Sequence, residues 1–564
     1  MDPQASSSPS LVARIEGAAE TSGTITFLGS AVGADTSSDS QTVAWVQLHS
    51  EARAMAAALQ ARGVGPGAHV AILGPTTREL VTAIEATWLC GAATVMLPLP
   101  LRLASLEEFV NQTRSRIRAS HAMFVVIDPQ LVDFIEVVEG DPPIARLDDL
   151  SKNSAMLTAD RYVRPADDPD ALAILQYTSG STSSPKGVML PHRAVTANLD
   201  AIARGAEIEP DFDVCVSWLP LYHDMGLIGL LSAPMSTGTD LVLSSPQDFL
   251  SSPRRWMDAM SEFGGTVTAG PNFSYVLAAR ALAKSSNLNL APWRIALNGA
   301  EPVDPDAVER FLAAGLKHFL DPSAAFPAFG MAEATLGVTF PDPGKGMVTD
   351  IVDAHALEHS GVAIPCAPGR DGSRRLARLG RQLHNMEIRI VDETSRSELP
   401  ERVVGELEIR GDSITTGYYC DTEATAEAFS EGWLRTGDRC YLADGELVVC
   451  GRLKDVIILG GRNVYPQDVE RAVSHLVGVR SGNVIAFGTT NSRGRESVVI
   501  VAETKETNHD NIRNEIKSAI YDNVGLPAAD IVLVTPGTLP KTSSGKLQRS
   551  LCKQRYADGA LSLA

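Results

Sequence analysis

The segment Tyr177–Leu190, YTSGSTSSPKGVML, contains six Ser or Thr residues, two glycines and one lysine between two apolar runs. The run ALAILQ before the hydroxyl-rich part predicts a strand, and GVML after it predicts that extended structure resumes. Glycines let backbone N–H groups point towards one spot, hydroxyls add donors, and Lys186 adds a positive charge. The segment therefore predicts a loop that binds polyphosphate oxygens. The alternative is a solvated Ser-rich linker, but a linker is not expected between two apolar strands.

This loop is not a Walker A motif. Lys186 follows Pro185 and precedes Gly187, so the Gly–Lys and Lys–Ser/Thr pairs of that motif are absent. The sequence therefore argues against a P-loop kinase or ATPase.

Composition narrows the class of protein further. The chain has 564 residues, of which 44% are hydrophobic and 21% charged, which is typical of a globular protein with two or three domains. The net charge of −19 argues against a nucleic-acid partner, since such proteins carry basic faces. Seven scattered cysteines without a CxxC pair favour a reducing, cytoplasmic location over a disulfide framework or a zinc site.

Neither a secretory signal nor a membrane span is predicted. Residues 1–10, MDPQASSSPS, lack a basic and an apolar region and are expected to form a disordered tail. The apolar run Ala86–Leu101 is too short for a span and is broken by Pro98 and Pro100. It is interpreted as a buried helix end followed by a core strand.

Helical and strand patterns alternate along most of the chain, which predicts an α/β fold with helices packed on sheet faces. The pattern changes after Asp455, where short strands and two helices make up a compact α+β unit. We therefore expect a large N-terminal domain over residues 11–453, with mixed sheets, and a small C-terminal domain over residues 454–564.

Five further motifs follow the hydroxyl-rich loop in order. They are NGAEPV (298–303), FGMAEAT (329–335), GWLRTGD (432–438), GRLKDVIILGGRNVYPQDVE (451–470) and LPKTSSGKLQR (539–549). Together with the loop they resemble the signatures of the adenylate-forming superfamily, which includes acyl-CoA synthetases, luciferases and peptide-synthetase adenylation domains. The resemblance covers almost the whole chain. It implies an acyl-CoA synthetase-like large domain and a mobile C-terminal lid.

The resemblance also implies ATP and Mg²⁺ as cofactors, and a role for each motif. Lys546, Glu333 and His223 are the implied catalytic residues, Glu333 and Thr178 serve the metal, and Lys454 is the hinge. A hard ion such as Mg²⁺ prefers carboxylate and phosphate oxygen. The implied nucleotide-binding residues are Thr178, Ser179, Gly180, Ser181, Thr182, Lys186, Gly299, Ala300, Glu301, Phe329, Gly330, Met331, Ala332, Asp438 and Arg452.

The stretch WLPLYHDMGLIG (218–229) resembles the fatty-acid branch of the superfamily rather than the amino-acid branch, which needs an acidic group to hold an ammonium. His223, Met225, Leu227 and Ile228 are the candidate acyl-binding residues. Ordinary core packing is the alternative interpretation for each of the apolar ones.

Residues 344–377 resemble the insertion of fatty acyl-AMP ligases, which disfavours reaction with coenzyme A. The expected activity is therefore formation of a fatty acyl-adenylate, followed by transfer to the phosphopantetheine thiol of an acyl carrier protein. A fatty acyl-CoA ligase is the alternative, and an inactive acyl- or nucleotide-binding relative is a third interpretation. Carrier proteins are acidic, so a local basic patch is expected, for which Arg549 with Lys553 is one candidate.

Overall fold

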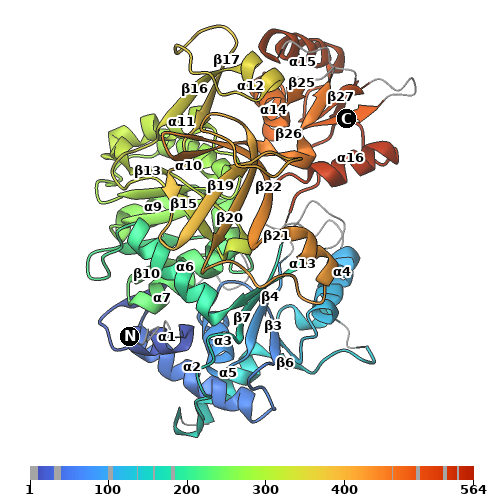
Figure 1. Cartoon of the computed structure of the whole chain (residues 1–564). Coiled ribbons are helices and arrows are strands. Elements are labelled where there is room, and N and C mark those ends of the chain that lie inside the picture. Colours follow the sequence, from blue (N-terminus) through green and yellow to red (C-terminus); the bar gives the residue numbers. More distant parts are fainter. Residues whose placement is uncertain are drawn as a thin grey trace.

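The computed structural model describes residues 10–30, 40–99, 106–135, 138–156, 159–178, 185–459, 462–490, 496–524, 530–542 and 545–564. Within these ranges the chain forms an α/β fold of several sheets with helices packed around them (Figure 1). No described helix combines the length and apolar character needed to cross a bilayer.

Two mostly parallel sheets make up the first part of the chain. The six-stranded sheet has the order β6 (Ile144–Arg146), β5 (Phe124–Ile127), β3 (His69–Leu73), β4 (Ala93–Met96), β7 (Leu172–Tyr177) and β8 (Gly187–Pro191). The seven-stranded sheet has the order β13 (Ala325–Pro327), β12 (Ile295–Asn298), β11 (Val267–Gly270), β9 (Val214–Ser217), β10 (Asp240–Leu243), β1 (Thr24–Phe27) and β2 (Gln41–Ala44). Only the last pair of each sheet, β7–β8 and β1–β2, is antiparallel.

Antiparallel strands follow. The described sheet of β19 (Met386–Val391), β20 (Gly405–Gly411), β21 (Phe429–Ser430), β22 (Trp433–Ala443) and β23 (Glu446–Arg452) carries the GWLRTGD motif. Smaller sheets contain β14 (Phe329–Gly330), β15 (Gly337–Phe340) and β18 (Arg381–Gln382), and, separately, β16 (Thr349–Asp353) with β17 (Ser373–Ala377).

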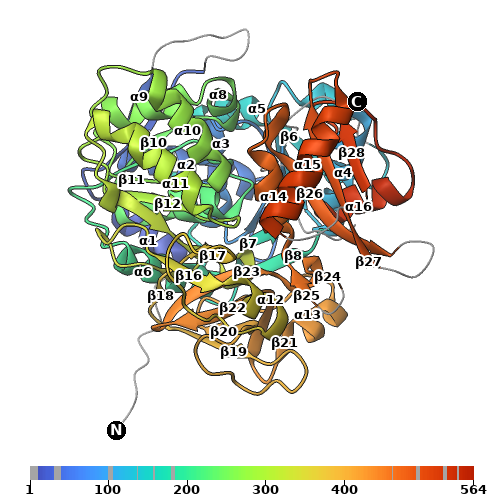
Figure 2. The same cartoon turned by 90° about the horizontal axis from the view of Figure 1, so that it is seen from above.

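The C-terminal unit has its own hydrophobic core. It contains the hairpin β24 (Ile457–Leu459) and β25 (Arg462–Val464), and a sheet of β26 (Val479–Thr490), β27 (Glu496–Thr504) and β28 (Asp530–Val534). Its helices are α14 (Pro466–Ser474), α15 (His509–Val524) and α16 (Arg549–Ala557). Seen from above, this unit (red) lies beside both the lobe of α9–α11 (green) and the antiparallel sheet (orange) (Figure 2).

The remaining helices pack around the sheets. They are α1 (Leu11–Ala18), α2 (Trp45–Gln60), α3 (Arg78–Leu89), α4 (Leu106–Ala119), α5 (Leu147–Met156), α6 (His192–Gly205), α7 (Ala233–Thr237), α8 (Pro246–Ser251), α9 (Arg254–Glu262), α10 (Asn272–Lys284), α11 (Pro305–Gly315), α12 (Ala354–Ser360) and α13 (Thr422–Ala428). The interpretation of Ala86–Leu101 as a helix end and a strand is confirmed by α3 and β4, both of which are buried.

Ser10 corrects the expected extent of the N-terminal tail. Its side chain is buried, accepts a hydrogen bond from the Ala13 N–H as the cap of α1, and donates to Asp167 at 2.6 Å. The sequence-based reasoning treated this serine as part of a polar run and overlooked its capping role. Residues 1–9 of the expected tail lie outside the described part of the chain.

Residues 344–377 form a folded unit between the antiparallel sheet and the C-terminal unit. Strands β16 and β17 pair along their length, and α12 follows β16. Asp350 accepts hydrogen bonds from Tyr441, Arg378 and Arg402 at 2.8 to 3.1 Å. Although burial acts to raise it, these donors lower the pKa of Asp350. Residues 344–377 are therefore attached to the antiparallel sheet through Asp350.

The connection that leaves this unit is sterically demanding, and we expect Gly380→Ala to destabilise the protein. Gly380 has φ +74°, and an added Cβ would lie 1.9 Å from the Phe340 carbonyl oxygen. Overpacking of this kind costs roughly 1–3 kcal/mol, beyond the ~1–2 kcal/mol of left-handed backbone. Gly372→Ala is the matched control, since Gly372 also has φ +74° but nothing near its added Cβ. Equal losses of thermal unfolding midpoint for the two variants would contradict the steric explanation.

Candidate active site

Lys546 lies at the junction between the C-terminal unit and the rest of the chain. Its Nζ is 3.3 Å from His223 Nε2, although the two residues are more than three hundred positions apart. The Thr542 N–H donates to the Lys546 carbonyl at 2.8 Å, and the Lys546 N–H donates to Thr542 Oγ1 at 3.1 Å, so the described part of the loop is tightly turned. Burial lowers the pKa of the Lys546 ammonium, while the charges of Asp224 and Glu301 act in the opposite direction.

His223 precedes a buried turn of π-helix over Met225–Ser232. Met225, Leu227 and Ile228 are buried there at 5%, 0% and 0% exposure and belong to the main hydrophobic core. Their packing does not distinguish an acyl-binding role from a core role, so the acyl assignment stays a prediction.

The NGAEPV motif forms a strained turn at the end of β12. Ala300 has φ +71°, a conformation that L-residues adopt at a cost. The Glu301 side chain turns inward and accepts a hydrogen bond from the Phe273 N–H at 2.7 Å. Burial raises the pKa of Glu301, against that hydrogen bond and the charge of Lys546. The charges of Glu301 and Lys546 therefore act on one another.

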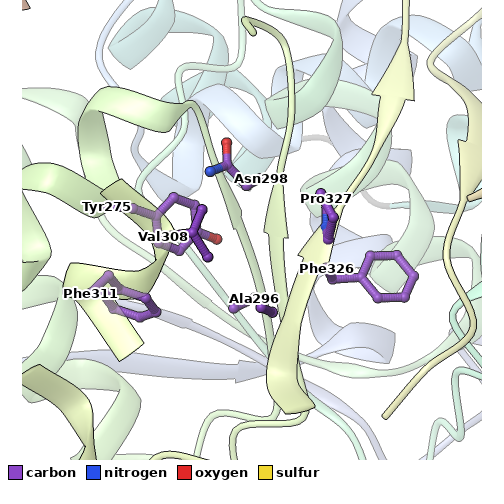
Figure 3. Close-up of a pocket in the computed structure, with 8 residues that line it drawn as sticks. Tyr275, Ala296, Asn298, Val308, Phe311, Phe326 and Pro327 are labelled. Carbon is purple, nitrogen blue, oxygen red and sulfur yellow. The ribbon is translucent and has the colours of Figure 1, made fainter. Parts of the chain in front are cut away.

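A small cavity lies beneath this turn (Figure 3). Its volume is about 10 Å³, roughly the space of one water molecule, so it is far too small for a nucleotide or an acyl chain. Figure 3 shows that it is enclosed by side chains of β12, β13 and the neighbouring helices. Its lining residues are Tyr275, Ala296, Asn298, Val308, Phe311, Ala325, Phe326 and Pro327.

Glu333 and Lys186 meet around one aromatic ring. Tyr418 donates a hydrogen bond from its hydroxyl to Glu333 Oε1 at 2.9 Å, and Lys186 Nζ lies 4.6 Å from the centre of the same ring. Phe329 forms β14, and Glu333 lies in a short 3₁₀ turn just after it. The structure thus brings the FGMAEAT motif and the far end of the hydroxyl-rich loop together. Ser179, Gly180, Ser181 and Thr182 lie outside the described residues.

Asp438 and Arg452 form an ion pair on neighbouring strands, with Arg452 Nε 3.2 Å from Asp438 Oδ1. Burial raises the pKa of Asp438, and Arg452 offsets part of that effect. Lys454 follows in a short turn, and burial lowers its pKa. Arg452, the ion-pair partner of the predicted ribose ligand Asp438, therefore lies only two residues before the predicted hinge Lys454.

The fit of the site to Mg²⁺ rests on donor chemistry. No described cluster of three or more His, Cys, Asp or Glu side chains could hold a metal by itself. Mg²⁺ is commonly bound through one or two carboxylates together with substrate phosphates. Glu333, half-buried and beside Lys186, is compatible with that mode; Thr178 donates its N–H to the Lys186 carbonyl at 3.1 Å.

The prediction that Arg549 belongs to a docking patch for a carrier protein is wrong. Its guanidinium contacts Asp455 at 2.7 Å and Glu470 at 2.8 Å, and its side chain is only 17% exposed. Both carboxylates belong to the C-terminal unit, so the charge of Arg549 is neutralised within that unit. Lys553, by contrast, is exposed on α16.

Three site contacts were not anticipated from the sequence. Asp224 lies beside His223, Tyr418 contacts Glu333, and the charge of Glu301 acts on the pKa of Lys546. For Asp224, the sequence signal that could have revealed its contact is its position directly after the predicted catalytic residue His223. Tyr418 lay in no motif, so only the fold reveals its contact.

Comparisons with known proteins identify the family of the chain. Residues 18–419 match the family model described as AMP-binding enzyme, and residues 454–564 match one described as Disco-interacting protein 2-like, AMP domain. The protein therefore belongs to the AMP-binding enzyme family, whose members use ATP to form adenylates.

Individual relatives are similar over nearly their whole length. A putative ligase of Mycobacterium tuberculosis is 39% identical over 90% of this chain and 93% of its own. The long-chain-fatty-acid–AMP ligase FadD26 of Mycobacterium bovis is 33% identical over 93% and 94%. A solved structure from a study of fatty acyl-adenylate ligases from E. coli and L. pneumophila is 30% identical, covers 98% of both chains, and superposes with a TM-score of 0.89.

Replacing Lys546 with Ala should slow adenylate formation by about 100-fold to 1,000-fold, as loss of one donor to developing charge does elsewhere. Pyrophosphate release under saturating ATP and fatty acid measures the effect. Lys553→Ala, which removes an exposed lysine nearby in sequence, is the control. A near-normal rate in the Lys546 variant would exclude its catalytic role.

Asp438→Ala should raise the KM for ATP with a smaller effect on kcat, because ribose contacts exist in both the ground and the transition state. Steady-state kinetics at varied ATP test this, with Asp412→Ala, an exposed carboxylate nearby, as the control.

Glu333→Gln should instead raise the Mg²⁺ concentration needed for half-maximal rate. Unchanged kinetics in both variants would place ATP elsewhere.

Proposed function

We propose that the protein activates a fatty acid as its acyl-adenylate and then transfers the acyl group to the phosphopantetheine thiol of an acyl carrier protein. The observation that carries the proposal is the contact of Lys546 with His223, which joins the lysine of the C-terminal loop to the fatty-acid-type motif. The similarity to a fatty-acid–AMP ligase and to fatty acyl-adenylate ligases supports the same activity.

In the first step a carboxylate oxygen of the fatty acid attacks the α-phosphorus of ATP. The bond from that phosphorus to the bridging oxygen breaks, and pyrophosphate leaves with the electron pair. In this scheme Lys546 lies between the two anions as charge develops. Glu333 would hold Mg²⁺, which neutralises phosphate charge when bound. Asp438 would hold the ribose, and the turn at Ala300 would let the backbone approach adenine.

For the second step we propose that residues 454–564 rotate as a lid about Lys454 and that residues 11–453 stay as the main body. Rotation removes Lys546 from the site and lets a thiol approach the acyl carbonyl. The thiol loses its proton to solvent, the sulfur bonds to that carbon, and the carbon–oxygen bond to phosphate breaks, so that AMP leaves with the electron pair. The separate hydrophobic core of the C-terminal unit supports its movement as one body.

The insertion supports a carrier protein rather than coenzyme A as acceptor, because it contacts the proposed lid directly. Arg374, on β17, contacts Asp468 of α14 at 3.0 Å and stacks over the Tyr465 ring at 4.2 Å. It also donates to the Cys450 carbonyl at 3.1 Å. Arg374 thus bridges the antiparallel sheet and the lid, and it opposes the rotation that either acceptor needs. A carrier protein can offset this cost through its own contacts with the enzyme surface, whereas free coenzyme A brings no protein surface to do so.

A second contact supports the same restraint. Glu358, on α12, accepts a hydrogen bond from Arg462 through its carboxylate. The carbonyl of Glu358 accepts another from Asn463 Nδ2 at 3.2 Å. Both partners lie on β25, next to the proposed hinge. The insertion therefore contacts the lid at two places while Asp350 anchors it to the main body.

We propose a cytoplasmic location. All seven cysteines are free thiols, which suits a reducing compartment.

The unaltered protein should form acyl-adenylate but little acyl-CoA, and Arg374→Ala should raise acyl-CoA formation on the order of tenfold. A shift of ~1.4 kcal/mol between the two lid positions is enough for that change. Product mass after incubation with ATP, a panel of fatty acids and coenzyme A measures it. A parallel reaction with a phosphopantetheine-loaded acyl carrier protein tests the preferred acceptor.

Arg375→Ala is a closely matched control for this experiment. Arg375 is the neighbouring residue on β17, but it contacts Asp306 and Glu309 of the main body, so its loss leaves the lid contact in place. Adenylation must survive in both variants. Efficient acyl-CoA synthesis by the unaltered protein would overturn the proposed acceptor and favour the acyl-CoA ligase alternative, whereas absence of acyl-adenylate would overturn the proposed activity itself.

A further inference from the structure

Asp224 is a carboxylate of the candidate site to which neither the motifs nor the proposed reaction assigns a role. Its side chain is 13% exposed. Its Oδ1 accepts a hydrogen bond from the Met225 N–H at 2.7 Å, at the start of the buried π-helical turn. The same oxygen lies 2.5 Å from His223 Nδ1. The side chain is therefore held in one place by the backbone and directed at the imidazole.

This contact decides which ring nitrogen of His223 accepts a hydrogen bond. Two groups face Nδ1: the Asp224 carboxylate at 2.5 Å and, further away, the Met225 N–H at 3.3 Å. An ionised carboxylate can only accept, so we assign the proton to Nδ1, where it is donated to the nearer partner. In the neutral imidazole the other nitrogen then has a free lone pair. That nitrogen is Nε2, which lies 3.3 Å from Lys546 Nζ. Asp224, His223 and Lys546 thus form a chain in which the lysine donates to the histidine and the histidine donates to the aspartate.

The electrostatics of the chain are consistent with this direction. Burial alone would raise the pKa of Asp224, but the contact with His223 and the charge of Lys546 bring it below its ordinary value. The charge of Asp224 in turn counters the effect of burial on the Lys546 ammonium. A charge removed from water needs such a partner. Glu301, which accepts a hydrogen bond from the Phe273 N–H, is the second carboxylate whose charge acts on Lys546.

We propose that Asp224 is a positioning residue for adenylation, which fixes the His223 tautomer so that Nε2 receives Lys546 when the lid docks. The inference rests on the proposed function, because Lys546 is taken to act in adenylate formation. Asp224 touches neither the fatty acid nor ATP in this scheme, and its whole effect passes through His223 and Lys546. In this scheme the Asp224–His223 pair binds the Lys546 ammonium until the substrate anions bind it instead.

The test is Asp224→Asn, which keeps the shape of the side chain. The amide can donate to Nδ1, which moves the ring proton to Nε2, and an Nε2–H faces the lysine ammonium unfavourably. We expect kcat for pyrophosphate release to fall about tenfold to 100-fold, the range for hydrogen bonds to charged groups. The equilibrium affinity for a non-hydrolysable ATP analogue should be unchanged, since the chain contacts no part of ATP. Asp211→Asn, an exposed aspartate upstream of the same segment, is the matched control.

The decisive measurement is the double variant with Lys546→Ala. If Asp224 acts through the lysine, Asp224→Asn should cause no further loss in that background, measured by single-turnover adenylate formation at high enzyme concentration. Additive losses would overturn the proposal, as would an unchanged kcat for Asp224→Asn alone or a weakened affinity for the ATP analogue. A failure of the proposed function is distinguishable, because the unaltered protein would then form no acyl-adenylate at all.

Discussion

One partly buried ammonium joins the two parts of the proposed active site. Lys546 comes from a loop of the C-terminal unit, yet it lies among groups of the main body. Its desolvation is unfavourable unless carboxylates and the imidazole lie at the right distance. The π-helical turn, the inward Glu301 side chain and the docking of the lid all contribute to that condition. The reaction that we propose needs the same arrangement, because two anions must approach one another at this point.

The fold follows from sequence patterns to a large extent. The hydroxyl-rich loop does connect two strands, β7 and β8, and these pair as a hairpin. The apolar runs around it form buried strands because they are long enough to cross a sheet and contain few helix signals. The change of pattern after Asp455 coincides with a unit that has a core of its own. Periodicity is reliable here because burial on the sheet faces dictates it.

The contacts between distant segments could not be predicted in the same way. The position of Tyr418 beside Glu333 depends on how the antiparallel sheet meets β8, which no local pattern encodes. The sequence offers Arg549 as a candidate surface cation, but in the structure it pairs with Asp455 and Glu470. Charge alone does not reveal burial, because a long side chain is exposed or paired according to its tertiary neighbours. Ser10 shows the same limit on a smaller scale, since a cap is recognisable only once its helix is known.

Asp350 and Arg374 hold different parts of the protein together: Asp350 contacts the antiparallel sheet, and Arg374 contacts the lid. Asp350 accepts hydrogen bonds from three donors, whereas Arg374 and Glu358 make a few polar contacts with the lid. None of the residues in these lid contacts is among the charged groups that act on Lys546. In our proposal, the choice of thiol partner and the chemistry of activation therefore depend on separate residues. A lineage carrying this insertion could change its acceptor through drift at a handful of peripheral positions, while the reacting groups remained under unaltered selection.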